Sequence, residues 1–365
     1  MISSFLNGVN SLFPTVNYSS ITFDDLESPR LVAAYVVFWD VSLVLTTIFF
    51  SFMLYMIITK SPREMSDYKW YLVHQLTWSY LFDLYVGLWK PVPLWPFYIG
   101  YSAGIFSNVG GNSVTIQLLI VVVNAIGMGF GVCISILHRY MQGSPFSFMY
   151  KLYSYLWFRF SAYVLAFVVL LGLLFLPLSL SFSLQTELEV SLTSKYPELV
   201  RIFELHPSMF GYDTDIVEYS VGYAFLIVSV LLVVIIVTII LYFNFARILK
   251  RNKTHLSSGT YKLQVMLFRT LFIQMLLAGV LLFLPITLCF ILTLFGFRWI
   301  SSFTLLAISF LGTHAIADFV VLCYFVRAYR TYIQGLFRKM WQKLNGTVIE
   351  KPQLFVSCSS VVLKH

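Results

Sequence analysis

The sequence predicts an all-α membrane protein, a bundle of seven transmembrane helices followed by a short amphipathic helix. Hydrophobic residues make up 59% of the 365 positions and charged residues only 11%, whereas soluble domains carry about 25% charge. Seven apolar stretches are each long enough to cross about 30 Å of hydrocarbon as a helix. Lys and Arg gather in alternate connecting segments, as expected of a chain that crosses a bilayer repeatedly.

The apolar stretches are separated by polar segments of unequal length. The predicted transmembrane helices are 31–59, 70–89, 113–137, 156–181, 219–246, 265–295 and 299–325. The longest connection lies between the fourth and fifth of them, and within it residues 195–206 are expected to form a short helix that begins near Pro197. Pro285 lies inside the sixth stretch and is expected to kink that helix and act as a hinge.

The placement of basic residues predicts the orientation of the chain. Most of the 24 Lys and Arg residues fall in segments 60–69, 139–151, 247–262 and beyond 326, which lie on one side of the predicted bundle. Because cytoplasmic segments carry the excess of basic residues, we expect the C-terminus inside and the N-terminus outside. Asn17 begins an Asn-X-Ser sequon on the expected outer side and is a candidate glycosylation site, whereas the sequons at Asn252 and Asn345 fall inside.

Residues 331–345 have the pattern of an amphipathic helix. One face carries Ile333, Leu336, Phe337, Met340, Trp341 and Leu344. The other face is polar and basic, so the segment is expected to lie on the inner leaflet, with packing against a partner as the alternative. The predicted organisation is an extracellular segment 1–30, a bundle 31–330, the amphipathic helix 331–345 and a flexible cytoplasmic tail 346–365.

Several polar residues fall inside the predicted helices, where they are expected to face the bundle interior. The candidates for an intramembrane network are Asp83, Asn124, Gln274, His314 and Asp318. Such a network either biases two arrangements of the bundle or is a static set of interhelical hydrogen bonds, and the sequence leaves both open.

Enzyme chemistry is not indicated anywhere in the chain. It lacks HExxH, GxSxG and P-loop patterns and clusters of Cys and His, so we expect no catalytic residues, no metal and no cofactor. The net charge of +8 is explained by the basic inner segments rather than by nucleic-acid binding.

Ordered strings resemble those of nematode serpentine chemoreceptors of the Str superfamily, class H or the related class I, which are G-protein-coupled receptors. These strings include Ser61-Pro62-Arg63-Glu64-Met65, Lys69-Trp70-Tyr71-Leu72, Leu81-Phe82-Asp83-Leu84 and Lys262-Leu263-Gln264. The resemblance implies a receptor in the plasma or ciliary membrane of sensory neurons that detects small molecules and activates a heterotrimeric G protein. His138-Arg139-Tyr140 occupies the place of the acidic-Arg-aromatic triplet of rhodopsin-like receptors, with His138 replacing the acid.

We therefore expect a chemosensory receptor without enzymatic activity. A ligand would bind in the outer half of the bundle, and the candidate contacts are Asp40, Gln117 and Trp299. The candidate residues facing the G protein are His138, Arg139, Tyr140, Arg247, Lys250, Arg251 and Lys262. The alternatives are a ligand-gated cation channel of inverted seven-helix type and a small-solute transporter.

Overall fold

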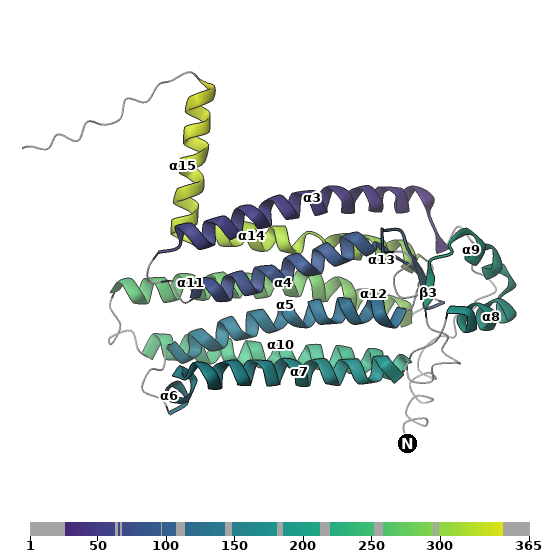
Figure 1. Ribbon diagram of the computed structural model, residues 1–365, viewed down its shortest axis with the longest axis horizontal. Coiled ribbons are helices and arrows are strands. Elements are labelled where there is room, and N and C mark those ends of the chain that lie inside the picture. The colour runs from purple at the N-terminus through teal and green to yellow at the C-terminus, as the bar shows by residue number, and fades with distance from the viewer. Residues whose placement is uncertain are drawn as a thin grey trace, which may run out of the picture.

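The computed structural model consists of long helices that run side by side (Figure 1). It describes residues 26–62, 65, 68–95, 97–106, 114–142, 148–180, 185–211, 220–251, 258–294, 297 and 299–345. The predicted sites at Asn17 and in the tail 346–365 lie outside these residues. Within them, five helices are long and apolar enough to cross a membrane: 29–60, 116–142, 156–173, 264–293 and 300–325.

Within the described residues, seven rods of helix build the bundle, as the sequence predicts. The five rods that are single helices are α3 (Pro29–Lys60), α4 (Tyr68–Trp89), α5 (Val114–Gln142), α7 (Leu156–Leu180) and α10 (Ser220–Arg251). A short helix, α6 (Phe148–Ser154), precedes α7. α4 is more polar than its neighbours because it contains Gln75, Ser79 and Asp83. All three side chains are buried.

The sixth predicted helix is divided rather than uniform. It consists of α11 (Ser258–Ala278), a π-helical turn η6 (Gly279–Phe283) and α12 (Leu284–Leu294). Pro285 has no backbone N–H to donate to the carbonyl of Leu281, which removes one α-helical hydrogen bond at this point. The irregular turn therefore lies immediately before the proline, and wider helical turns of this kind occur frequently at functional sites.

The seventh predicted helix is also divided, into α13 (Ile300–Leu311) and α14 (His314–Phe325). The break falls at Gly312, where a β-carbon would lie 2.7 Å from the indole of Trp39. Ser42 of α3 donates a hydrogen bond to the Gly312 carbonyl at 3.1 Å. The neighbouring helix α3 therefore supplies a hydrogen bond to a backbone carbonyl at the break between α13 and α14.

A three-stranded antiparallel sheet, which the sequence did not predict, covers one end of the bundle. Its order is β1 (Pro91–Leu94), β2 (Ile99–Ser102) and β3 (Met209–Gly211). The strands are too short to show alternation, and prolines in β1 are tolerated because β1 is an edge strand. The predicted helix at 195–206 is present as η4 (Pro197–Leu199) and α9 (Val200–Leu205), preceded by α8 (Gln185–Lys195). We call this the sheet end.

The last helix, α15 (Arg327–Leu344), leaves the opposite end and runs crosswise to the bundle (Figure 1). Tyr329, near its start, is fully buried, and its hydroxyl lies 2.7 Å from the hydroxyl of Ser61. The remainder of the helix has exposed apolar side chains at Phe337, Met340 and Trp341. We call this the α15 end.

Among the described residues, a large hydrophobic cluster lies at each end of the bundle, and a smaller third cluster contains Tyr85, Trp89 and Phe210. Trp39, Leu94 and Met209 belong to the cluster at the sheet end, which joins α3 to β1 and β3. Met53 and Phe319 belong to the cluster at the α15 end, which joins α3, α4 and α14.

Close helix packing makes a matched prediction about two glycines of α5. A methyl group at Gly127 would overlap the indole of Trp78, whereas a methyl group at Gly129 meets nothing within 4 Å. We expect Gly127→Ala to lower the free energy of unfolding by about 1–3 kcal/mol through overpacking. Gly129→Ala should be neutral or slightly stabilising because alanine favours helix. Thermal unfolding of the purified variants in detergent measures both effects, and equal melting temperatures would contradict the packing.

Candidate functional site

Buried polar side chains connect α4 with α14 inside the bundle. Asp83 and Asp318 are each 2% exposed, and they lie close enough to interact electrostatically. Gln75 is buried on the same helix as Asp83, and neither Asp83 nor Gln75 has a side-chain hydrogen-bond partner among the described residues. Nδ1 of His314 lies 3.3 Å from the hydroxyl of Ser79. Three members of the predicted network, Asp83, His314 and Asp318, therefore belong to one group.

The other two predicted members are buried but make no contact with this group among the described hydrogen bonds. Asn124 donates a hydrogen bond to the Ile120 carbonyl of its own helix at 2.8 Å. The amide of Gln274 has no hydrogen-bond partner in the described part of the chain, although its side chain is only 2% exposed. Gln75, which the sequence analysis did not single out, is also buried on α4, and its amide likewise has no hydrogen-bond partner among the described residues.

At the α15 end, Arg139 is clamped between two other helices. Its guanidinium lies over the ring of Tyr68 in α4, 3.5 Å from the ring centroid, and Nη1 donates to Oε1 of Gln264 in α11 at 2.8 Å. The side chain is only 2% exposed. A buried guanidinium needs partners to offset its desolvation, and an aromatic face and an amide oxygen are both favourable partners. We call Arg139, Tyr68 and Gln264 the arginine clamp.

His138, which stands where an acid was expected by comparison with rhodopsin-like receptors, packs into a group of tyrosines. Its ring stacks on Tyr71 with centroids 4.2 Å apart, and Nδ1 lies 2.9 Å from the hydroxyl of Tyr153. The hydroxyl of Tyr153 lies 2.7 Å from that of Tyr163. The histidine thus joins α4, α5, α6 and α7 without forming an ion pair with Arg139.

The residues expected to face a G protein divide into two sets. His138 and Arg139 are buried and Tyr140 is partly buried, so the first two are not part of the accessible surface in this conformation. The exposed set, which surrounds them at the α15 end, is Arg247, Lys250, Arg251 and Lys262.

Sequence reasoning missed the two partners of Arg139. Tyr68 was not singled out because tyrosine is common near membrane interfaces. Gln264 was noted only as part of the string Lys262-Leu263-Gln264. A polar amide at the start of an apolar stretch, opposite an arginine at the end of another, was the available signal for this contact.

The three expected ligand contacts are not gathered in one place. The Asp40 side chain is 63% exposed and its carboxylate lies 2.6 Å from Nζ of Lys90, while Trp299 is 62% exposed. Gln117 is fully buried near the sheet end of α5, and neither atom of its amide has a described hydrogen-bond partner. Of the three, only Gln117 lies in the interior.

The sheet is fastened to the bundle by side chains from separate segments. The carboxylate of Glu27 accepts a hydrogen bond from the Tyr101 hydroxyl at 2.8 Å and lies 2.9 Å from Nε2 of His206. The rings of Tyr101 and His206 stack with centroids 3.7 Å apart. Burial and the adjacent Glu27 carboxylate raise the pKa of Tyr101, so its hydroxyl remains a donor. We call these three residues the sheet latch.

A second connection joins the sheet to α13. The backbone N–H of Trp95 donates to the Ser301 hydroxyl at 2.9 Å, and that hydroxyl lies 3.2 Å from the Trp95 carbonyl. The turn after β1 is therefore attached directly to the sheet-end half of the divided seventh helix. As for metals, the described residues contain no group of three or more His, Cys, Asp or Glu side chains that could hold an ion.

The described residues form a bundle of apolar helices, several of them long enough to cross a bilayer, and so define a multi-pass membrane protein. The family model of the serpentine type 7TM GPCR chemoreceptor Srh matches residues 32–339. The chain belongs to this family, which is class H of the nematode Str superfamily. The resemblance found in the sequence is thereby confirmed, and the family is a receptor class rather than an enzyme class. A search of curated proteins found no match.

The sheet latch predicts a measurable loss of stability. Replacing Glu27 by alanine removes the acceptor shared by Tyr101 and His206, and hydrogen bonds to a charged group contribute about 1.5–3 kcal/mol each. We expect Glu27→Ala to lower the free energy of unfolding by about 2 kcal/mol. Glu204→Ala is the control because Glu204 is exposed on nearby α9. Thermal unfolding compares the two variants, and the same melting temperature in both would rule out the latch.

Proposed function

We propose that the chain is a chemosensory receptor that binds a small molecule in the sheet-end half of the bundle and activates a heterotrimeric G protein through the α15 end. Membership of a chemoreceptor family supports the general class. The membrane would be the plasma or ciliary membrane of a sensory neuron, as the sequence resemblance implies.

The observation that carries this proposal is the arginine clamp. Gln264 lies in α11, the half of the divided sixth helix nearer the α15 end, and Arg139 lies near the last residue of α5. As long as the contact persists, α11 is held against α5, and the guanidinium is enclosed. An outward movement of α11 would break the hydrogen bond and uncover Arg139 among the exposed basic residues Arg247, Lys250 and Arg251. The π-helical turn η6 supplies a place where α11 can bend relative to α12.

The charges of the described residues support an orientation with the α15 end in the cytoplasm. This end includes Lys60, Lys69, Lys151, Arg159, Arg247, Lys250, Arg251, Lys262, Arg269, Arg327, Arg330, Arg338, Lys339 and Lys343. The sheet end includes Arg30, Lys90, Lys195 and Arg201. Cytoplasmic segments carry the larger share of basic residues in membrane proteins. With this orientation, α15 lies along the inner leaflet with its apolar side chains in lipid.

Ligand recognition is assigned to the interior beneath the sheet. Gln117 offers a donor and an acceptor that no described side chain occupies, and buried amides of this kind usually pair with something. Asp40 contributes by holding Lys90 at the end of α4 rather than by direct contact, because its side chain is 63% exposed. Trp299 is placed at the membrane boundary, where tryptophan side chains are favoured.

The clamp predicts the effect of changing Gln264 on basal signalling. Gln264→Ala removes the acceptor for Arg139, and the loss of a hydrogen bond to a charged group shifts the equilibrium by about tenfold. We expect basal G-protein activation to rise several-fold, measured by a resonance-energy-transfer assay with a panel of Gα subunits and normalised to surface expression. Gln264→Glu should lower it because an ion pair replaces the neutral contact.

Thr270→Val is the matched control for Gln264→Ala. Thr270 is buried on α11, whereas Gln264 is partly buried, and the Thr270 hydroxyl donates to the Met266 carbonyl of the same helix and so joins no other helix. Its basal activity should equal that of the unchanged chain. An unchanged basal activity in Gln264→Ala, with coupling to some Gα subunit demonstrated, would refute the clamp.

A glycosylation test separates the receptor from the inverted channel. In the proposed orientation Asn17 is outside, so Asn17→Gln should abolish the mobility shift caused by glycosidase treatment. Asn252→Gln and Asn345→Gln should leave that shift unchanged because both sequons are inside. A shift that depends on Asn345 instead would indicate the inverted topology and support a cation channel. Substrate flux in proteoliposomes would support the transporter.

A further inference from the structure

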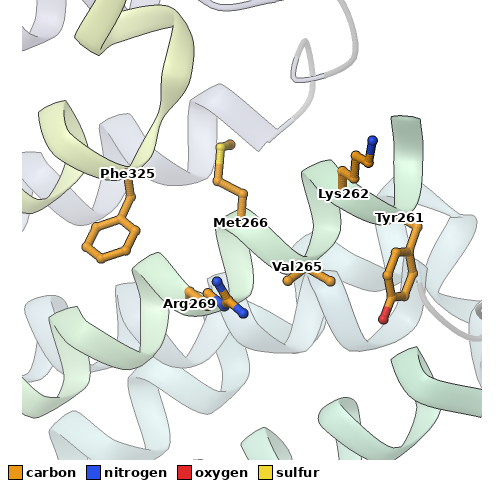
Figure 2. Close-up of a pocket in the computed structure, with 6 residues that line it drawn as sticks. All are labelled: Tyr261, Lys262, Val265, Met266, Arg269 and Phe325. Atoms are coloured by element: carbon orange, nitrogen blue, oxygen red, sulfur yellow. The ribbon is translucent and has the colours of Figure 1, made fainter. Parts of the chain in front are cut away.

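A cavity of about 240 Å³ opens between the sixth and seventh helices at the α15 end (Figure 2). It is lined by Tyr261, Lys262, Val265, Met266 and Arg269 of α11 and by Phe325 at the end of α14. Lys262, Val265, Met266 and Arg269 follow the spacing of one helical face, because 3.6 residues complete a turn. Along this face the cationic side chains of Lys262 and Arg269 lie at the two ends, and the apolar side chains of Val265 and Met266 lie between them.

No residue that lines the cavity neutralises the positive charges of Lys262 and Arg269. Both cations are exposed, and no acidic residue is among the side chains that line the cavity. Arg269 lies inside the apolar span 264–293, where an isolated charge is costly unless it reaches the interface or a partner. Over the described residues, no carboxylate lies within ion-pair distance of Arg269. A negatively charged group brought to this depth by lipid would supply the missing partner.

The surface beyond the cavity matches the rest of such a molecule. Phe272, Leu276 and Val280 continue along the same face of the sixth helix toward the middle of the bundle, and they are 43%, 55% and 49% exposed. An acyl chain lying along this stripe would place its headgroup between Lys262 and Arg269. A soluble phosphate compound would leave the stripe uncovered, and an acidic peptide would need to enter the hydrocarbon to reach Arg269.

We propose that this cavity is a binding site for a phospholipid with an anionic, phosphate-bearing headgroup, held by Lys262 and Arg269 and by apolar contact with Met266 and Phe325. Basic pockets between transmembrane helices on the cytoplasmic side bind lipid headgroups of this kind. Lys262, expected from the sequence to face the G protein, thereby faces lipid. The inner leaflet as the source rests on the proposed orientation, but the binding itself does not.

The test uses the full-length chain in nanodiscs and the double variant Lys262→Gln with Arg269→Gln. Native mass spectrometry measures the bound fraction of short-chain phosphatidylinositol phosphate, and short-chain phosphatidylcholine is the neutral comparison. We expect the anionic lipid to bind the unchanged chain, and the double variant to bind it about tenfold more weakly. The single variant Arg269→Gln should show a smaller loss, which keeps the test decisive if the double variant does not fold.

The matched control is Lys339→Gln with Lys343→Gln, which removes the same charge from exposed positions of α15. Binding by this control should remain within about twofold of the unchanged chain, since its lysines are not at the cavity. Equal losses in both double variants would show general attraction to the basic end and overturn the site. Equal binding of free inositol phosphate would indicate a soluble ligand and overturn it as well. Because none of these measurements involves signalling, failure here is distinct from failure of the receptor proposal.

Discussion

The whole architecture depends on one constraint, that a backbone amide inside hydrocarbon must find its hydrogen-bond partner within the protein. Long helices satisfy this requirement internally, which is why the bundle is built from seven of them. Where a helix is interrupted, another group has to compensate. At Gly312 the hydroxyl of Ser42 donates a hydrogen bond to the backbone carbonyl. Before Pro285 the helix continues as a wider π-helical turn rather than ending. In the part of the chain that the structure describes, the sheet lies at the end of the bundle, where the connecting segments meet.

The same constraint explains which parts of the fold were predictable. The apolar stretches predict the helices closely, because a transmembrane helix is recognised from the composition of about 20 consecutive residues. Interruptions at Gly312 and Gly279–Phe283 depend on contacts with Trp39 and on the local loss of one hydrogen bond, which composition does not record. The sheet was missed because three or four residues per strand carry no alternating pattern, and because β3 comes from a connection more than a hundred residues after β1.

Predictability of the site follows a different rule. Asp83, His314 and Asp318 were recognised individually because ionisable groups are rare in lipid, and all three are buried on α4 and α14. The partners of Arg139 were not recognised because Tyr68 and Gln264 are unremarkable in composition, and their importance comes only from where the helices place them. The replacement of an acid by His138 signalled that an ion pair was absent, but not that tyrosines would surround the imidazole. A sequence thus shows an unusual residue more readily than it shows the ordinary residues that contact it.

The division of the seventh helix at Gly312 has a consequence for how the molecule can vary. α13 is attached to the sheet through Ser301 and Trp95, while α14 belongs to the buried polar group and leads into α15. A continuous helix would carry a rotation of one half into the other, but a two-residue break absorbs part of such a rotation. The sheet-end half of this helix can therefore be repacked by substitution with little displacement of the α15-end half. In engineering terms the break is a joint between an exchangeable sheet-end half and a fixed α15-end half.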